Sequence, residues 1–167
     1  VVIVKCGIGK VNAAACTQVL IDHFAVDCVI NVGVAGGIFA DLKIGDVVIS
    51  TDAVQHDMDV SALGDPIGTI PRMDESYFKA DEELIELAEK AGETLEGHNV
   101  YKGRVASGDK FISTQEQKTF LWNNFKAYCA EMEGAAMAHV CYLNRIPFVI
   151  IRSISDNADG SAGISYN

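Results

Sequence analysis

The sequence has 167 residues, of which 49% are hydrophobic and 22% charged, with a formal net charge of −10 at pH 7. A chain of this length and hydrophobic content can bury one substantial core, so we expect a single domain over residues 1–167. The negative charge repels phosphate backbones and anionic lipid, which argues against a nucleic-acid or membrane partner. No apolar run reaches the roughly 18 residues of a membrane span, and no secretion signal is visible.

The cysteines point to a reducing compartment. None of the five forms a CxxC pair, and all fall in apolar segments, where a free cysteine acts as a small hydrophobe. The odd number and these surroundings predict reduced thiols and a cytoplasmic location. The chain starts inside an apolar run and stops at Asn167 without a terminal helical pattern, so we expect it to be part of a longer polypeptide.

The first part of the chain alternates apolar strands with a helix. Residues 1–6 are a near-continuous apolar run, typical of a strand buried on both faces. The turn 7–10 (GIGK) leads into a helix predicted over 11–24. Such a turn can hold a phosphate on backbone N–H groups, but GxG without a third glycine is a weak dinucleotide signal, and we expect no dinucleotide cofactor. A second buried strand, 26–32, leads into 33–37, whose three glycines permit either close approach of a ligand or a structural bend.

The segment 56–73 follows a short strand predicted over 47–50 and carries Gly and Pro residues that rule out a long helix. It is nevertheless rich in apolar residues, so we expect it to pack over a site or against a second subunit. His56 lies beside Asp57 in this segment. The two are either a titrating pair or, as we favour, a satisfied structural histidine with an acidic neighbour.

Further along, 81–95 is the clearest helix pattern, with Asp81 as its N-cap. Residues 100–106 predict a strand, closed by the polar stretch 107–112 (SGDKFI). The stretch 113–116 has capping-box spacing for a following helix.

Two carboxylates, Glu131 and Glu133, stand at the junction between a strand predicted over 125–129 and a helix predicted over 134–144. They either complement the dipole of the helix from solvent or belong to a site. An unpaired buried charge costs several kcal/mol, so a core would not accept both without a reason.

Alternating helices and near-continuous apolar strands predict an α/β fold in three αβα layers, with a largely parallel or mixed central sheet. Polar residues fall at four strand ends, 33–37, 107–111, 131–133 and 152–156, the last after a strand predicted over 147–151. Ends that converge on one crevice make a small-molecule site in this class of fold. Arg152 needs a partner, and Glu131 or Glu133 would serve, which leaves Asp156 for a ligand.

Five motifs occur in order: GIGKVNAA (7–14), NVGVAGG (31–37), SGDKFI (107–112), EMEGAAMAHV (131–140) and RSISD (152–156). Over essentially the whole chain they resemble the bacterial 5′-methylthioadenosine/S-adenosylhomocysteine nucleosidases, of the purine nucleoside phosphorylase-like superfamily. The resemblance implies hydrolysis of the N-glycosidic bond of both nucleosides, giving adenine and a thioribose. It implies no cofactor and no metal.

The resemblance also implies roles on the side of the base. Asp156 would be the acid that protonates adenine N7, with Ser155 orienting it. Phe111 would stack on the adenine, and Ile112 would bind it through backbone groups. Ala35 and Gly36 would line the floor of the site.

On the side of the sugar, Glu133 would accept hydrogen bonds from the 2′- and 3′-hydroxyls, and Met132 would pack against the ribose. Arg152 would position Glu133 and the attacking water, with Glu131 among the residues around the substrate. Three residues of the apolar segment match positions that cap the 5′-thio pocket of the neighbouring subunit in a homodimer: Val60, Leu63 and Pro71.

The sequence also departs from the family. The family's second catalytic acid, a Glu that activates water, lies upstream of Val1, and its C-terminal helix with an aromatic lid has no match, so we expect impaired catalysis by these 167 residues alone. Asn31 and Val34 replace residues that hold phosphate in related phosphorylases, which favours water as co-substrate. A phosphorolytic nucleoside phosphorylase and a non-catalytic nucleoside-binding module remain alternatives.

Overall fold

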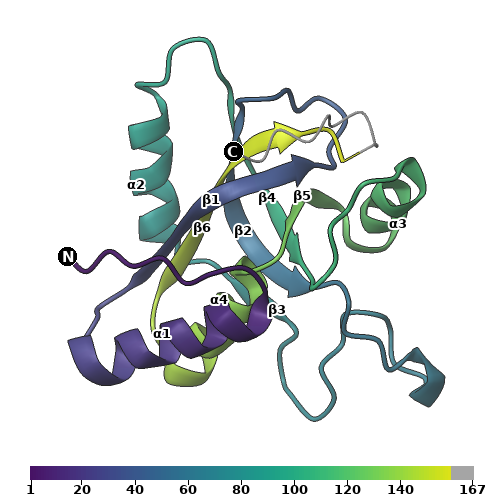
Figure 1. Ribbon diagram of the computed structural model, residues 1–167, viewed down its shortest axis with the longest axis horizontal. Coiled ribbons are helices and arrows are strands. Elements are labelled where there is room, and N and C mark those ends of the chain that lie inside the picture. Colours follow the sequence, from purple (N-terminus) through teal and green to yellow (C-terminus); the bar gives the residue numbers. More distant parts are fainter. Residues whose placement is uncertain (159–167) are drawn as a thin grey trace.

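Helices and strands alternate along the computed structural model, which describes residues 1–158 (Figure 1). In chain order the elements are α1 (Lys10–Phe24), β1 (Val29–Gly37), β2 (Val47–Gln55), a 3₁₀ turn (Ser61–Leu63), β3 (Tyr77–Lys79), α2 (Glu82–Gly92), β4 (Val100–Ser107), α3 (Gln115–Phe125), β5 (Ala127–Glu131), α4 (Gly134–Asn144) and β6 (Phe148–Asp156). The end of the chain, for which no helix is expected, lies outside the described residues. No helix within residues 1–158 is long and apolar enough to cross a bilayer.

The strands form one mixed sheet in the order β3-β2-β4-β5-β1-β6. β1–β6, β2–β4 and β4–β5 pair in parallel, whereas β1–β5, β2–β3 and β2–β6 pair antiparallel. The extra pairing of β2 with β6 makes the sheet curl back on itself. The α/β class with a mixed sheet flanked by helices is therefore confirmed.

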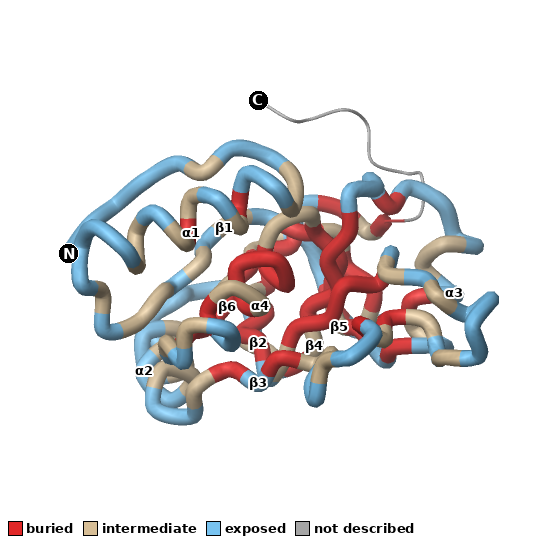
Figure 2. The backbone as a smooth tube through the Cα atoms, turned by 90° about the horizontal axis from the view of Figure 1, so that it is seen from below, coloured by how far each residue is buried: buried red, intermediate tan, exposed pale blue. Residues whose placement is uncertain are grey.

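Helix α4 lies at the centre of the molecule and is buried along most of its length (Figure 2). Its small residues, such as Ala135 and Ala138, let it pack closely on the sheet, and α1 covers its other side. Because α1 contacts α4 through Ala13 and Thr17, the larger apolar residues of α1, Val11 and Phe24 among them, are exposed. The apolar stripe that the sequence predicts for this helix, through Val11, Val19 and Phe24, thus faces outward.

The strand predicted over residues 1–6 is wrong. These residues have no regular structure, and Val1 and Ile3 are almost fully exposed. A strand needs a neighbour that accepts its backbone hydrogen bonds, and no strand within residues 1–158 pairs with this run. The outer face of β1 is likewise exposed at Ile30 and Val32. Apolar composition alone cannot make a strand where no partner is present.

Other predictions need correction at their boundaries. The glycine segment 33–37 is part of β1, and the polar stretch 152–156 is part of β6, so the strands predicted over 26–32 and 147–151 end too early. The strand predicted over 125–129 is β5, Ala127–Glu131, and the strand predicted over 47–50 extends to Gln55. The capping box is shifted by one residue, since Thr114 and not Ser113 is the N-cap of α3. Asp81 caps α2 as predicted by accepting a hydrogen bond from Leu84 N–H at 3.0 Å.

Segment 56–73 is irregular apart from its 3₁₀ turn, as predicted. Leu63 is 80% exposed, and Pro71 is also exposed. The short strand β3 that follows this segment was not predicted from the sequence. All five cysteines lie within residues 1–158 and are free thiols.

Candidate active site

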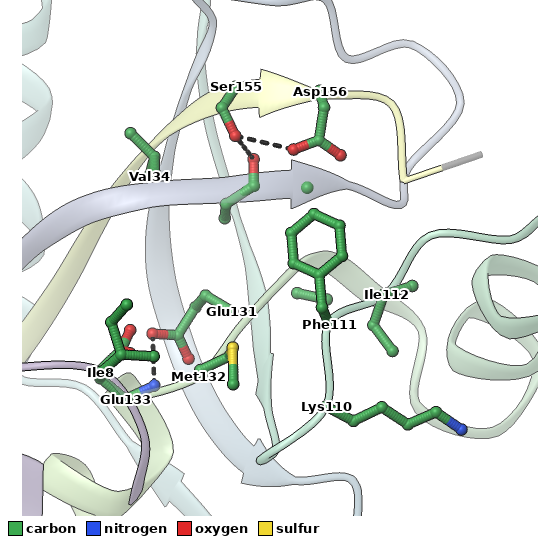
Figure 3. Close-up of a pocket in the computed structure, with 13 residues that line it drawn as sticks. Ile8, Val34, Lys110, Phe111, Ile112, Glu131, Met132, Glu133, Ser155 and Asp156 are labelled. Atoms are coloured by element: carbon green, nitrogen blue, oxygen red, sulfur yellow. Dashed lines mark hydrogen bonds between the residues drawn. The ribbon is translucent and has the colours of Figure 1, made fainter. Parts of the chain in front are cut away.

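A cavity of about 260 Å³ opens where the carboxyl ends of β1, β5 and β6 meet the loop that follows β4 (Figure 3). This is near the lower end of the roughly 300–1,000 Å³ typical of ligand pockets. The residues that line it are Ile8, Val34, Ala35, Gly36, Lys110, Phe111, Ile112, Ala130, Glu131, Met132, Glu133, Ser155 and Asp156. The site predicted from the strand ends is therefore one connected space.

One side of the cavity is formed by the end of β6. Ser155 Oγ lies 2.8 Å from Asp156 Oδ2, and Asp156 Oδ1 accepts a hydrogen bond from Ala158 N–H at 2.9 Å. The Asp156 residue is 9% exposed. A Cβ at Gly36 would lie 3.1 Å from Asp156 Oδ1, so the glycine leaves room for this carboxyl group beside β1.

Phe111 and Ile112 lie on the loop after β4, on the side of the cavity away from Glu133 (Figure 3). Ile112 is buried, whereas Phe111 is 56% exposed and presents its ring to the cavity. An exposed aromatic ring at the mouth of a cavity is a surface on which a flat apolar molecule can stack.

The carboxylate of Glu131 is buried and its hydrogen bonds are all internal. It accepts from Gly134 N–H at 2.7 Å, from Glu133 N–H at 3.1 Å and from the hydroxyl of Ser107. Arg152 forms an ion pair with the same group. Although Glu131 lines the cavity, both of its carboxylate oxygens are bonded by protein groups. It therefore holds neighbouring residues in place.

Arg152 does not line the cavity but lies behind it. Its Nη2 contacts Asn31 and Glu131, and lies 3.8 Å from Glu133 Oε2. Its Nε is buried without a hydrogen-bond partner among residues 1–158. A Cβ at Gly33 would overlap Arg152 Nη1. The glycine at this position therefore makes room for the Arg152 side chain and not for a ligand.

Glu133 is the more exposed of the two carboxylates. Its Oε1 accepts a hydrogen bond from Gly9 N–H at 2.9 Å. Gly9 follows Ile8, which with Lys110 forms an exposed edge of the cavity that we call its entrance. Burial raises the pKa of Glu133, with the charge of Glu131 acting in the same direction, and the Gly9 N–H and Arg152 act against this shift. Its second oxygen has no internal hydrogen bond among residues 1–158 and can accept one from a ligand.

Nine of the predicted site residues are brought together by the fold: Ala35, Gly36, Phe111, Ile112, Glu131, Met132, Glu133, Ser155 and Asp156. Val60, Leu63 and Pro71 are not, since they lie on the irregular segment away from this cavity.

Sequence reasoning missed several residues around the cavity. Ile8 and Lys110 line it, and both belong to motifs singled out for other positions. The GIGK turn is a weak phosphate signal by its sequence, and its proximity to the site is visible only in the fold. His56 is 6% exposed, as expected of a structural histidine, but its Nε2 has no partner among residues 1–158 and is not satisfied.

The cavity thus offers a carboxyl–hydroxyl pair on one side and an acceptor carboxylate on the other, with an aromatic ring near Asp156 (Figure 3). This arrangement suits a ligand with a flat ring that can be protonated and with hydroxyl groups at its opposite end.

Comparisons with known proteins show the family of this chain. The model of the phosphorylase superfamily matches residues 1–166. A 5′-methylthioadenosine/S-adenosylhomocysteine nucleosidase of Geobacillus kaustophilus is 46% identical over 166 residues, which cover 99% of this chain and 70% of that protein.

Two solved structures are also similar. The Neisseria meningitidis 5′-methylthioadenosine/S-adenosylhomocysteine nucleosidase in complex with methylthio-immucillin-A is 46% identical, with a TM-score of 0.91 over 96% of this chain and 70% of the other. The futalosine hydrolase of Helicobacter pylori is 40% identical, with a TM-score of 0.90 over 96% of this chain and 68% of the other.

Proposed function

Because this chain belongs to the 5′-methylthioadenosine/S-adenosylhomocysteine nucleosidases of the phosphorylase superfamily, we propose that it hydrolyses the N-glycosidic bond of these two nucleosides. The products are adenine and the 5′-thioribose. The observation that carries the proposal is the placement of the Ser155–Asp156 pair and Glu133 on opposite sides of one cavity.

Cleavage of this bond builds positive charge on the ribose and negative charge on the departing base. Asp156 donates a proton to N7 of the adenine, and the adjacent Ser155 hydroxyl fixes the orientation of the carboxyl group. Phe111 stacks on the base, and the backbone at Ile112 binds its edge. Ala35 and Gly36 form the floor beneath it.

Glu133 accepts hydrogen bonds from the 2′- and 3′-hydroxyls, and Met132 packs against the sugar. Glu131 is held by internal bonds and aligns Arg152, which lies within 3.8 Å of Glu133. Arg152 in turn positions Glu133 and, through it, the attacking water. Among residues 1–158, the carboxylates of the cavity are Glu131, Glu133 and Asp156, and each already has one of these tasks.

Water is the proposed co-substrate in place of phosphate. Asn31 and Val34 offer no cation at the glycine-rich end of β1, and the guanidinium of Arg152 is committed to Glu131. Lys110 lines the cavity, but its ammonium points away from Glu133 and Asp156 (Figure 3). A phosphorylase would need a cationic pocket for the phosphate dianion. Addition of phosphate is therefore expected to leave the rate unchanged.

The proposal extends to a cytoplasmic homodimer in which Val60, Leu63 and Pro71 cap the 5′-thio pocket of the neighbouring subunit. The exposure of two of these residues, Leu63 (80%) and Pro71, supports it, because apolar residues gathered on one exposed segment mark an interaction surface. Sedimentation equilibrium tests this assembly, and a monomer at micromolar concentration would refute it.

The decisive experiment measures adenine release from 5′-methylthioadenosine in phosphate-free buffer by this chain and by its Asp156→Asn variant. We expect slow turnover, because none of the three carboxylates that line the cavity among residues 1–158 is left to take the proton of the attacking water. The substitution should lower this turnover by at least about a hundredfold more, since it removes the proton donor. S-adenosylhomocysteine and futalosine serve as competing substrates, because one similar structure is a futalosine hydrolase. Adenine binding without turnover would identify a non-catalytic nucleoside-binding module. The absence of both adenine binding and turnover would refute the site.

A further inference from the structure

Three charged residues outside the cavity join the segments that form its entrance. Lys10 Nζ lies 2.6 Å from Asp57 Oδ1. The backbone N–H of Lys10 donates to Asp109 Oδ1 at 2.8 Å, and the backbone N–H of Asp109 donates to Asp57 Oδ2 at 2.9 Å. Each of the three residues contacts the other two, and we refer to them as the polar latch.

Two of the three latch residues are next to residues of the site. Lys10 follows Gly9, whose N–H donates to Glu133, and Asp109 precedes Lys110 and Phe111. Asp57 does not line the cavity. It therefore joins the two sides of the entrance without contacting a ligand.

The turn before α1 depends on these bonds for its position. Residues 1–7 have no regular structure, so no strand fixes the chain that enters the turn. Gly9, the N-cap of α1, has φ +96° and no side chain to cap the helix. The first N–H groups of α1 are bonded instead by Glu133 and Asp109.

The loop after β4 packs on the residues that precede Asp57. The backbone N–H of His56 donates to Ser107 O at 2.9 Å. A Cβ at Gly108 would lie 2.6 Å from His56 Nε2, so the loop backbone packs directly on the imidazole. Lys10 Nζ also contacts Gln55 Oε1 at 3.2 Å. The position of Asp57 is thus fixed from both sides.

The charges around Asp57 keep it ionised at neutral pH. Burial acts to raise its pKa, but hydrogen bonds from the Lys10 ammonium and the Asp109 N–H, with the positive charge of Lys10, outweigh burial and hold the pKa below its ordinary value. Burial lowers the pKa of the neighbouring His56, with the charge of Lys10 in the same direction and that of Asp57 opposed. The ion pair of the latch is therefore formed under physiological conditions.

We propose that Asp57 is a positioning residue: through Lys10 and Asp109 it keeps the Gly9 N–H on Glu133, so that this carboxylate stays aimed at the sugar hydroxyls. The identity of the sugar rests on the proposed function, whereas the link from Asp57 to Glu133 does not. Glu133 is also faced by Glu131, Arg152 and Cys6, none of which contacts Asp57.

The test compares Asp57→Asn with Asp52→Asn as a matched control. Asp52 lies on β2, and its carboxylate pairs with Arg104 at 2.6 Å, at an exposure similar to that of the Lys10–Asp57 pair. Among residues 1–158, the guanidinium of Arg104 bonds Asp52 and the Phe125 carbonyl, and neither residue lines the cavity. The control therefore removes an ion pair without loosening the entrance. Lys10→Gln is a second variant that breaks the latch from its other end.

The first readout is the pKa of Glu133, measured in the ligand-free chain by carboxyl carbon NMR. Loss of the Gly9 hydrogen bond removes a group that favours the ionised form, so the pKa of Glu133 should rise in Asp57→Asn and Lys10→Gln and stay unchanged in Asp52→Asn. An unchanged Glu133 pKa in both latch variants would overturn the proposal. A merely destabilised fold would lower the midpoint of unfolding without moving this value.

The second readout is affinity at pH 7 for two probes, 5′-methylthioadenosine and free adenine. The latch variants should lose roughly tenfold in affinity for the nucleoside, as for a weakened hydrogen bond to a charged group, and less than about twofold for adenine. Equal losses for both probes would overturn the proposal. If the unmodified chain binds neither, the proposed function fails, and the NMR comparison still decides whether Asp57 acts on Glu133.

Discussion

The two carboxylates at the end of β5 stand one residue apart, yet their surroundings differ completely. Glu131 lies in a buried network in which Ser107, Gly134 and Arg152 bind its oxygens. Glu133 lies at the cavity entrance, where Gly9 is its hydrogen-bond donor. The first region is complete without a ligand, and the second leaves an acceptor open. The difference shows that burial and internal partners, not residue type, separate a carboxylate that supports the fold from one that is open to a ligand.

The largest expected effect comes from Arg152→Met, which leaves the Glu131 charge buried without its partner. We expect a loss of about 3–5 kcal/mol in the free energy of unfolding, measured in urea at pH 7. Adding Glu131→Gln should recover part of this loss, because it removes the unpaired charge. If Arg152→Met alone were as stable as the original chain, Arg152 and Glu131 would not depend on each other for stability.

Gly33→Ala tests the same network without changing any charge. Its Cβ would overlap Arg152 Nη1, so the guanidinium must leave its place between Asn31 and Glu131. We expect a cost of about 1–3 kcal/mol in the free energy of unfolding, as for overpacking, together with loss of adenine release.

Val32→Ala is the control for Gly33→Ala. Val32 is the preceding residue of β1 and is 72% exposed, so its truncation should cost less than about 1 kcal/mol. Equal effects of the two substitutions would mean that strand propensity, and not displacement of Arg152, accounts for the loss.

Glu133→Gln should have the smallest effect on stability and a large effect on binding. Burial raises the pKa of Glu133 above its ordinary value of 4.5, so this group contributes stability at low pH that is lost as pH rises through the folded-state pKa. The variant should therefore gain stability relative to the original chain between pH 4 and 7, by less than about 1 kcal/mol.

The measurement for Glu133→Gln is urea unfolding at several pH values, paired with binding of 5′-methylthioadenosine. A variant that lost as much stability as Arg152→Met would place both carboxylates in one structural network. That result would remove the distinction between the two regions.

The site was predictable to the extent that its residues stand at strand ends. Parallel pairing brings the carboxyl ends of β1 and β6 together, and likewise those of β4 and β5, so the segments 33–37 and 152–156, and 107–112 and 131–133, form two groups. That these two groups meet, where β1 pairs antiparallel with β5, is visible only in the fold. The polar latch cannot be grouped in this way, because only Asp109 stands at a predicted strand end, whereas Lys10 starts a helix and Asp57 lies in an irregular segment.

Sequence alone determined the α/β class, the helix Gly134–Asn144 to the residue, and the strand ends that carry residues of the cavity. Local periodicity and chain alternation carry that information. Only the tertiary structure decided that residues 1–6 are not a strand, that Glu131 pairs with Arg152, and that Gly9 bonds Glu133. Each of these depends on which distant group is present to accept a hydrogen bond or balance a charge, and no local pattern records it.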